Sequence, residues 1–111
     1  MYNYKAFVQR VVYGDTFDAD VDLGFGITLS FRFRLNDIDT PETWRPKSNA
    51  EREHGELATA RVKELIEGKE IIIYSYKLGI YGRYSADVYL LSGISLADLL
   101  KEEGFEKKDS Y

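Results

Sequence analysis

The stretch "TFDADVDLGFGITLSFRFRL", residues 16–35, decides the fold of this 111-residue chain. Its first half alternates, with Phe17, Ala19 and Val21 on one face and three aspartates on the other. "GFG" at residues 24–26 is typical of a turn, and the alternation then resumes. The pattern predicts a β-hairpin whose second strand directs five apolar side chains inward: Ile27, Leu29, Phe31, Phe33 and Leu35.

Further elements are expected on both sides of the hairpin. "YKAFVQRVV", residues 4–12, is rich in β-branched and aromatic residues and predicts a strand before it. A long polar loop over residues 36–50 is followed by a helix over roughly residues 51–67, which ends at Gly68. The apolar stripe of this helix is expected to consist of Leu57, Val62, Leu65 and Ile66.

The last third of the chain predicts two strands and a short helix. The strands are "EIIIYSY" at residues 70–76 and "YSADVYLL" at residues 84–91. Ser95 is a suitable cap for the helix "LADLLKEE", which Gly104 ends. Three strands, a helix, two strands and a helix is the order of a five-stranded Greek-key barrel of the OB type. We therefore expect a mainly β (α+β) fold that forms a single domain over residues 1–111.

Composition excludes several classes of protein. The 44% hydrophobic content favours a folded globular chain, and the absence of cysteine excludes disulfides and thiolate metal sites. A net charge of −4 argues against a protein that coats nucleic acid by electrostatics alone. Two stretches are nevertheless net positive, residues 28–50 with four basic and three acidic side chains and residues 71–97 with two and one.

The sequence gives no sign of membrane association. "MYNYKAFVQRVV" at the start lacks a long apolar run and a small-residue cleavage site, and no segment approaches membrane-spanning length. We expect no signal peptide, no obligate protein partner and a monomer that is cytoplasmic, or secreted if a leader has been removed.

A crowded acidic segment follows the hairpin. "RLNDIDTPETW", residues 34–44, gathers Asp37, Asp39 and Glu42 close to Arg32 and Arg34. Carboxylates repel one another, so this crowding favours a bound cation or a catalytic task. Each of these residues, taken alone, also has an ordinary interpretation as a turn, cap or surface residue.

Three motifs carry a resemblance to a known family: "VVYGDT" at residues 11–16, "RLNDIDTPE" at residues 34–42 and "YGR" at residues 81–83. In this order and spacing they resemble the staphylococcal-nuclease (thermonuclease-like) family, from about Val11 to Gly104. The resemblance implies a calcium-dependent phosphodiesterase or endonuclease on an OB-type barrel. Such an enzyme hydrolyses DNA and RNA with little sequence specificity and leaves 3′-phosphate products.

The resemblance also implies roles for individual residues. Asp15 and Asp39 would bind calcium through their side chains, and Thr40 through its backbone carbonyl. Glu42 would be the general base. The two arginines Arg34 and Arg83 would contact the scissile phosphate.

Three aromatic residues lie near these motifs. Tyr81 is a candidate for substrate binding by stacking, although strand packing is the alternative in a chain with nine tyrosines. Trp44 either contacts the substrate or pins the loop to the barrel, and both interpretations are open. Tyr13 stands where secreted relatives in the resembled family tend to carry a further acid.

Elementary chemistry agrees with the implied roles. Calcium takes about six to eight oxygen ligands, so two aspartates and one carbonyl leave positions for water and a phosphate oxygen. A positioned carboxylate base contributes about 10²–10⁴-fold in rate. Guanidinium groups are planar and always charged, which suits the equatorial oxygens of a five-coordinate phosphorus.

Other features are set aside. "DADVDLG" at residues 18–24 opens like an EF-hand loop but lacks its glycine and glutamate and lies on an expected strand, although Asp20 could approach the metal site. His54 is the only histidine and cannot form a zinc site alone. The rival function is a non-catalytic OB-fold module that binds nucleic acid or a protein. The complete set of acids and arginines favours the enzyme, because a module that only binds has no physical reason to keep them together.

Overall fold

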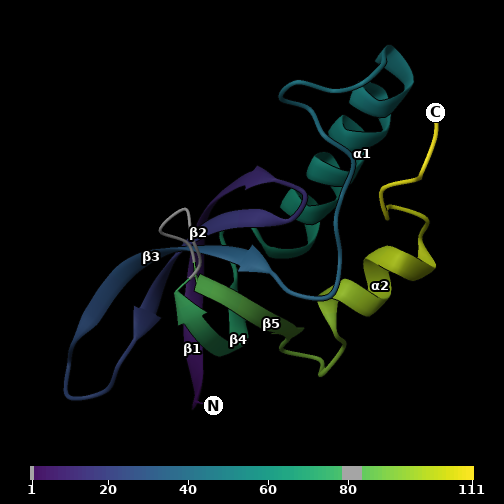
Figure 1. The fold of residues 1–111 in the computed structure, drawn as a ribbon. Helices are drawn as coiled ribbons and strands as arrows, with labels where there is room; N and C mark the ends of the chain where they lie inside the picture. Colours follow the sequence, from purple (N-terminus) through teal and green to yellow (C-terminus); the bar gives the residue numbers. More distant parts are fainter. Residues whose placement is uncertain (1, 79–83) are drawn as a thin grey trace.

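The computed structural model describes residues 2–78 and 84–111. Its elements follow one another along the chain as β1 (Tyr2–Tyr13), β2 (Thr16–Asp22), β3 (Thr28–Leu35), α1 (Asn49–Ile66), β4 (Glu70–Leu78), β5 (Tyr84–Leu90) and α2 (Leu96–Glu102) (Figure 1). This is the order expected from the sequence. Neither of the two helices is long and apolar enough, within the described ranges, to span a membrane.

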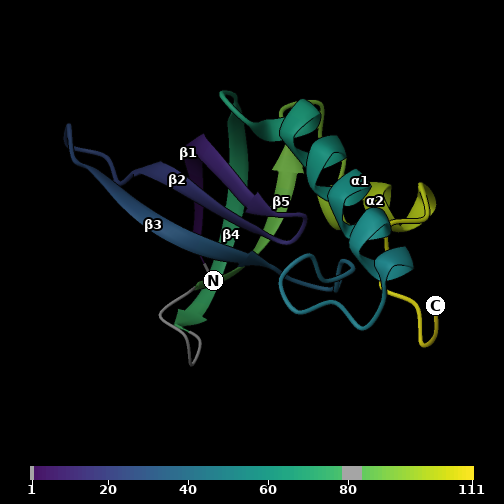
Figure 2. The same cartoon turned by 90° about the horizontal axis from the view of Figure 1, so that it is seen from above.

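The five strands close into a barrel in the order β1-β2-β3-β5-β4. Neighbouring strands are antiparallel, except for β3 and β5, which run parallel and complete the closure. Figure 2 shows both helices on the same side of the barrel. The predicted mainly β fold, with a five-stranded barrel of the OB type and two helices, is therefore confirmed.

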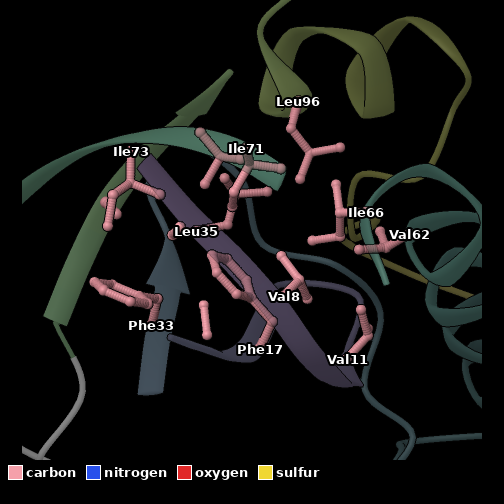
Figure 3. Packing of buried hydrophobic residues seen from close by; sticks show 14 of the residues in the cluster. Val8, Val11, Phe17, Phe33, Leu35, Val62, Ile66, Ile71, Ile73 and Leu96 are labelled. Atoms are coloured by element: carbon pink, nitrogen blue, oxygen red, sulfur yellow. The ribbon is translucent and has the colours of Figure 1, made fainter. Parts of the chain in front are cut away.

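The hydrophobic core fills the barrel and continues beneath the helices (Figure 3). Phe17 and Phe33 stack inside the barrel with ring centroids 5.5 Å apart. Val62 and Ile66 of α1 and Leu96 of α2 face these strands and are almost completely buried. Each such side chain contributes about 1.5–3 kcal/mol on burial, so the helices are fixed to the barrel by their apolar faces.

The outer half of the β2–β3 hairpin differs from the expectation. Ile27 and Leu29 are each 50% exposed and do not face the core. The reason is that β3 pairs with β5 only over Phe33–Leu35, whereas its outer part has β2 as its neighbour. The alternation of the sequence correctly predicts the strand, but nothing in the described part of the chain covers this end of it.

Helix α1 begins two residues earlier than predicted. The Ser48 Oγ accepts a hydrogen bond of 3.2 Å from the Glu51 N–H and caps the helix. The prediction that Leu57 belongs to the buried stripe is wrong, since this side chain is 63% exposed. The buried face instead carries Glu51, Gly55, Ala58, Val62 and Ile66.

The second helix ends and begins as expected. The Ser95 Oγ accepts a hydrogen bond of 3.3 Å from the Asp98 N–H at the start of α2. Gly104 follows this helix with a φ of 83°, in the left-handed region that favours glycine. The local capping signals of the sequence therefore predict both ends of α2.

Candidate active site

Residues from three separate parts of the chain meet at one open cavity of about 550 Å³. The turn between β1 and β2 contributes Asp15, β3 contributes Arg34, and the loop after β3 contributes Asp39, Thr40 and Glu42. The structure thus brings together five of the seven residues to which the sequence analysis gives a role in binding metal, catalysis or binding substrate. The other two, Tyr81 and Arg83, lie outside the described residues.

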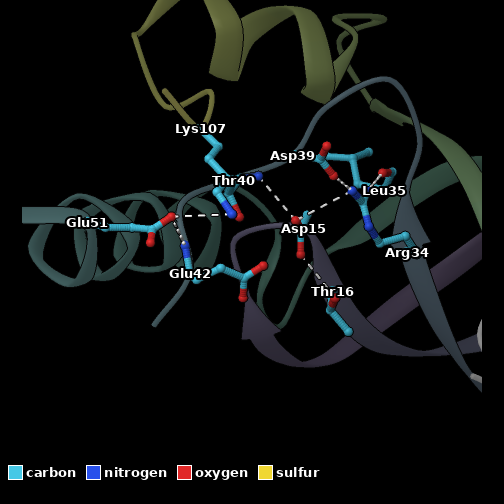
Figure 4. A network of polar contacts seen from close by, with 9 residues as sticks. All are labelled: Asp15, Thr16, Arg34, Leu35, Asp39, Thr40, Glu42, Glu51 and Lys107. Atoms are coloured by element: carbon cyan, nitrogen blue, oxygen red, sulfur yellow. Dashed lines mark hydrogen bonds and ion pairs between the residues drawn. The ribbon is translucent and has the colours of Figure 1, made fainter. Parts of the chain in front are cut away.

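The Asp15 carboxylate joins the turn to the loop (Figure 4). Its Oδ1 accepts a hydrogen bond of 3.1 Å from the Thr16 hydroxyl, and its Oδ2 accepts one of 3.1 Å from the Thr40 N–H. The preceding Gly14 makes this approach possible, because a Cβ on it would lie 2.8 Å from the Thr40 Oγ1. A glycine is therefore required here for space.

Arg34 lies between two aspartates (Figure 4). Its Nη2 is 3.7 Å from the Asp15 Oδ2 and donates a hydrogen bond to the Asp39 Oδ1, while its Nη1 donates to the Leu35 carbonyl. The Asp15 side chain is 16% exposed, whereas that of Asp39 is 75% exposed. A single positive group thus reaches both carboxylates from a partly buried position.

The residues that could hold a metal ion offer only oxygen atoms. Asp15 and Asp39 are two hard ligands, and the Thr40 carbonyl is the third on sequence grounds. Within residues 2–78 and 84–111, no three His, Cys, Asp or Glu side chains gather closely enough to hold a metal ion. These oxygen donors are of the type that a hard cation takes, but such an ion would compete with the Arg34 guanidinium for the two aspartates.

The backbone N–H of Glu42 is bound by Glu51, a residue that was not selected from the sequence. This side chain of α1 is fully buried. Its Oε1 accepts a hydrogen bond of 2.7 Å from the Lys47 N–H, and its Oε2 accepts one of 3.4 Å from the Glu42 N–H. The Lys47 N–H, followed by the Glu42 N–H and the ammonium of Lys107 3.4 Å away, holds the pKa of Glu51 below its ordinary value against the opposing effect of burial.

A sequence signal for Glu51 exists. Ser48 and Glu51 have the spacing of a capping box, in which the glutamate side chain returns to the N–H of the capping residue. Here the carboxylate reaches further, to the N–H groups of Lys47 and Glu42. The motif therefore indicates the helix start, but the contact with Glu42 depends on the fold of the loop.

The segment after α2 supports the same loop. The Lys107 N–H donates a hydrogen bond of 2.7 Å to the Asp39 carbonyl, and its ammonium reaches the Oε2 of Glu51 (Figure 4). Two residues of the site region are thus held by a residue more than fifty positions away in the sequence. The structure adds Lys107 to the residues that shape the site.

The features set aside in the sequence have ordinary partners. Arg32 forms two hydrogen bonds with Asp18, of 2.7 and 3.0 Å, and these lower the pKa of Asp18. Asp20 accepts hydrogen bonds from Gln9 and Ser30 and is not among the residues that line the cavity. The aspartates of β2 therefore belong to a polar strand face.

His54 lies in α1 and is not among the residues that line the cavity. Its Nε2 is 2.7 Å from the Gly104 carbonyl, and its Nδ1 is 2.8 Å from the hydroxyl of Tyr111. Both ring nitrogens thus have partners in the segment that follows α2. The histidine fixes this segment to the helix.

Comparison with known proteins adds two findings. The sequence model of the staphylococcal nuclease homologues matches residues 32–109, which is more than half of the chain. A probable staphylococcal-like nuclease of Oryza sativa subsp. japonica is 42% identical over 63 residues. These residues make up 57% of this chain but 15% of the rice protein, so the similarity concerns a small part of that relative.

Proposed function

The chain belongs to the family of staphylococcal nuclease homologues, and from this premise we propose that it is a calcium-dependent endonuclease. It hydrolyses phosphodiester bonds in DNA and RNA with little sequence specificity. The observation that supports this proposal is the meeting of Asp15, Arg34, Asp39 and Glu42 at one cavity. Two acids, a base and a phosphate ligand are the groups that this chemistry needs.

In this proposal Asp15, Asp39 and the Thr40 carbonyl would hold the calcium ion. When bound, calcium neutralises the phosphodiester and polarises its phosphorus–oxygen bonds as a Lewis acid. Arg34 donates hydrogen bonds to the non-bridging oxygens, whose negative charge grows as phosphorus becomes five-coordinate. Arg83 is the second arginine and Tyr81 a substrate contact on sequence grounds alone.

Glu42 takes the proton from the attacking water. Its side chain is exposed and extends toward Asp15 and Thr16, while its own N–H is held by Glu51 (Figure 4). As the water oxygen bonds to phosphorus, the bond to the 5′ oxygen breaks and that oxygen takes a proton from solvent. The products are a 3′-phosphate and a 5′-hydroxyl.

The test is a cleavage assay on single-stranded DNA with calcium, magnesium or a chelator. We expect cleavage with calcium and none with the chelator, and a loss of about 10²–10⁴-fold for Glu42→Gln. Glu56→Gln is the matched control, because it makes the same change at an exposed position of α1 outside the cavity. Equal rates for Glu42→Gln and wild type would remove Glu42 as the base.

A second candidate function is a non-catalytic OB-fold module that binds nucleic acid or a protein. Two observations favour it. Both aspartates are engaged with Arg34, and the described part of the chain has no cluster of three acidic, histidine or cysteine side chains that could hold a metal ion. In this case an oligonucleotide or protein partner binds, but no metal ion produces cleavage. Cleavage with calcium but not with the chelator supports the nuclease, whereas binding without cleavage under all three conditions supports the binding module.

A further inference from the structure

Two aromatic side chains line the cavity that contains Asp15, Asp39 and Glu42. Tyr13 is the last residue of β1 and 37% exposed, and Trp44 follows Glu42 by two residues and is 63% exposed. Both line the same cavity as Asp15 and Glu42. An indole that pinned the loop to the barrel would be buried, so its exposure argues against that role.

The backbone next to Trp44 is strained in a way that supports its side chain. Arg45 has a φ of 58°, a left-handed conformation that is uncommon for a residue other than glycine. In this conformation its guanidinium lies over the indole, 4.4 Å from the ring centroid. Strained residues of this kind persist where the surrounding structure holds them, and they concentrate at ligand sites.

The charge of the cavity restricts what the aromatic wall can accept. Asp15, Asp39 and Glu42 line the cavity together with two arginines. Arg34 is engaged with the two aspartates, and Arg32 is paired with Asp18. The Arg45 guanidinium covers one face of the indole, which leaves the other face for a flat ring, and a neutral aromatic ring is not repelled by these carboxylates. Nucleobases are neutral and have a π-face that stacks on tryptophan and tyrosine.

From these observations we propose that Tyr13 and Trp44 form a subsite that stacks a nucleobase of a single-stranded nucleic acid next to the phosphodiester bond. This inference rests on the proposed function, because that function puts a phosphate at Arg34. Stacking does not depend on hydrogen bonds to base edges, so the subsite accepts any base. It prefers single strands, since a base in a duplex must first be unstacked and unpaired.

Trp44 is the only tryptophan of the chain, so its emission reports directly on the subsite. The probe is an oligothymidylate of roughly eight nucleotides, within the length that a single OB fold covers. It is titrated in the presence of a chelator, so that the signal does not depend on cleavage. We expect the oligothymidylate to quench the emission, and a strand of equal length without bases, or a duplex, to quench it much less.

Substitutions test the same contact through affinity for a fluorescently labelled oligothymidylate. Loss of one stacked base is expected to weaken binding about 5- to 100-fold in Trp44→Leu, and Trp44→Phe should restore most of it. Phe25→Leu is the matched control, since Phe25 is fully exposed but lies outside the cavity. Its affinity should equal that of the wild type.

The outcomes separate this inference from the proposed function. Equal quenching by the strand without bases, or unchanged affinity of Trp44→Leu, overturns the subsite even if calcium produces cleavage. Base-dependent quenching without cleavage in calcium supports the subsite and leaves the chain as a binding module. Base-dependent quenching together with cleavage supports both.

Discussion

Gly55→Ala is the sharpest test of how α1 packs against the loop between β3 and α1. A Cβ at Gly55 would lie 2.5 Å from the Pro41 carbonyl oxygen and 2.8 Å from the Thr43 Cγ2. Non-bonded atoms prefer a separation of about 3.5 Å, so the loop must move by about 1 Å. Pro41 is followed directly by Glu42, and the movement therefore displaces the proposed base.

Two effects of opposite sign decide the stability of Gly55→Ala. Alanine is favoured over glycine in a helix by about 1 kcal/mol. Overpacking against a backbone carbonyl costs about 1–3 kcal/mol, because the carbonyl cannot rotate away as a flexible side chain can. We expect a net loss of about 1 kcal/mol in the free energy of unfolding, together with a loss of about tenfold to a hundredfold in cleavage rate.

The assays are urea denaturation in a chelator and cleavage under single-turnover conditions with calcium. Ala60→Gly is the control, since Ala60 is an exposed position of the same helix and its replacement measures the helix propensity alone. The reasoning is refuted if Gly55→Ala is more stable than wild type by the amount that Ala60→Gly loses. That result would mean that the loop does not press against the helix.

Three further predictions concern the same region. Gly14→Ala should weaken calcium binding, measured by titration calorimetry, because the new Cβ would lie 2.8 Å from the Thr40 Oγ1 and separate Asp15 from the loop; an unchanged affinity would contradict this. The lowered pKa of Glu51 means that its ionised form stabilises the fold above the ordinary pKa of about 4.3, and that this stabilisation is lost as the pH falls through the lower folded value. Glu51→Gln should therefore melt at a lower temperature than wild type at pH 7, and the difference should shrink below about pH 4 rather than stay constant. Calcium at about 100 times its dissociation constant should stabilise the fold by about 2.7 kcal/mol in thermal melting, and a melting curve that calcium leaves unchanged would argue against the ion as ligand.

The sequence predicts most of the fold because its local signals agree with one another. The alternation over β2 correctly assigns Phe17, Ala19 and Val21 to the core, and Ser95 correctly marks the start of α2. These signals depend on side chains a few residues apart, which a sequence displays directly. The prediction fails for Ile27 and Leu29, because their burial depends on whether another strand covers the end of the hairpin.

The site is predictable only in part for a similar reason. Asp15 and Asp39 could be selected from motifs, and the structure brings both to one cavity. The capping box marks Glu51 as a residue of the helix start, but its bonds to Lys47 and Glu42, and the bond of Lys107 to Asp39, involve backbone groups that any residue carries. Every residue has these backbone groups, so the sequence of the loop does not show which of its N–H or C=O groups will be bound.

The arrangement of these supports explains how a long loop could carry the proposed catalytic groups. Loops are more mobile than helices and strands, and a base misplaced by about 1 Å loses much of its effect. Here the loop is held at Thr40 by the barrel turn, at Glu42 by a buried carboxylate of α1, and at Asp39 by Lys107. The three contacts come from the β1–β2 turn, from α1 and from the segment after α2, and all act on the backbone. The side chains of Asp39 and Glu42 therefore remain exposed to a substrate while their positions are fixed.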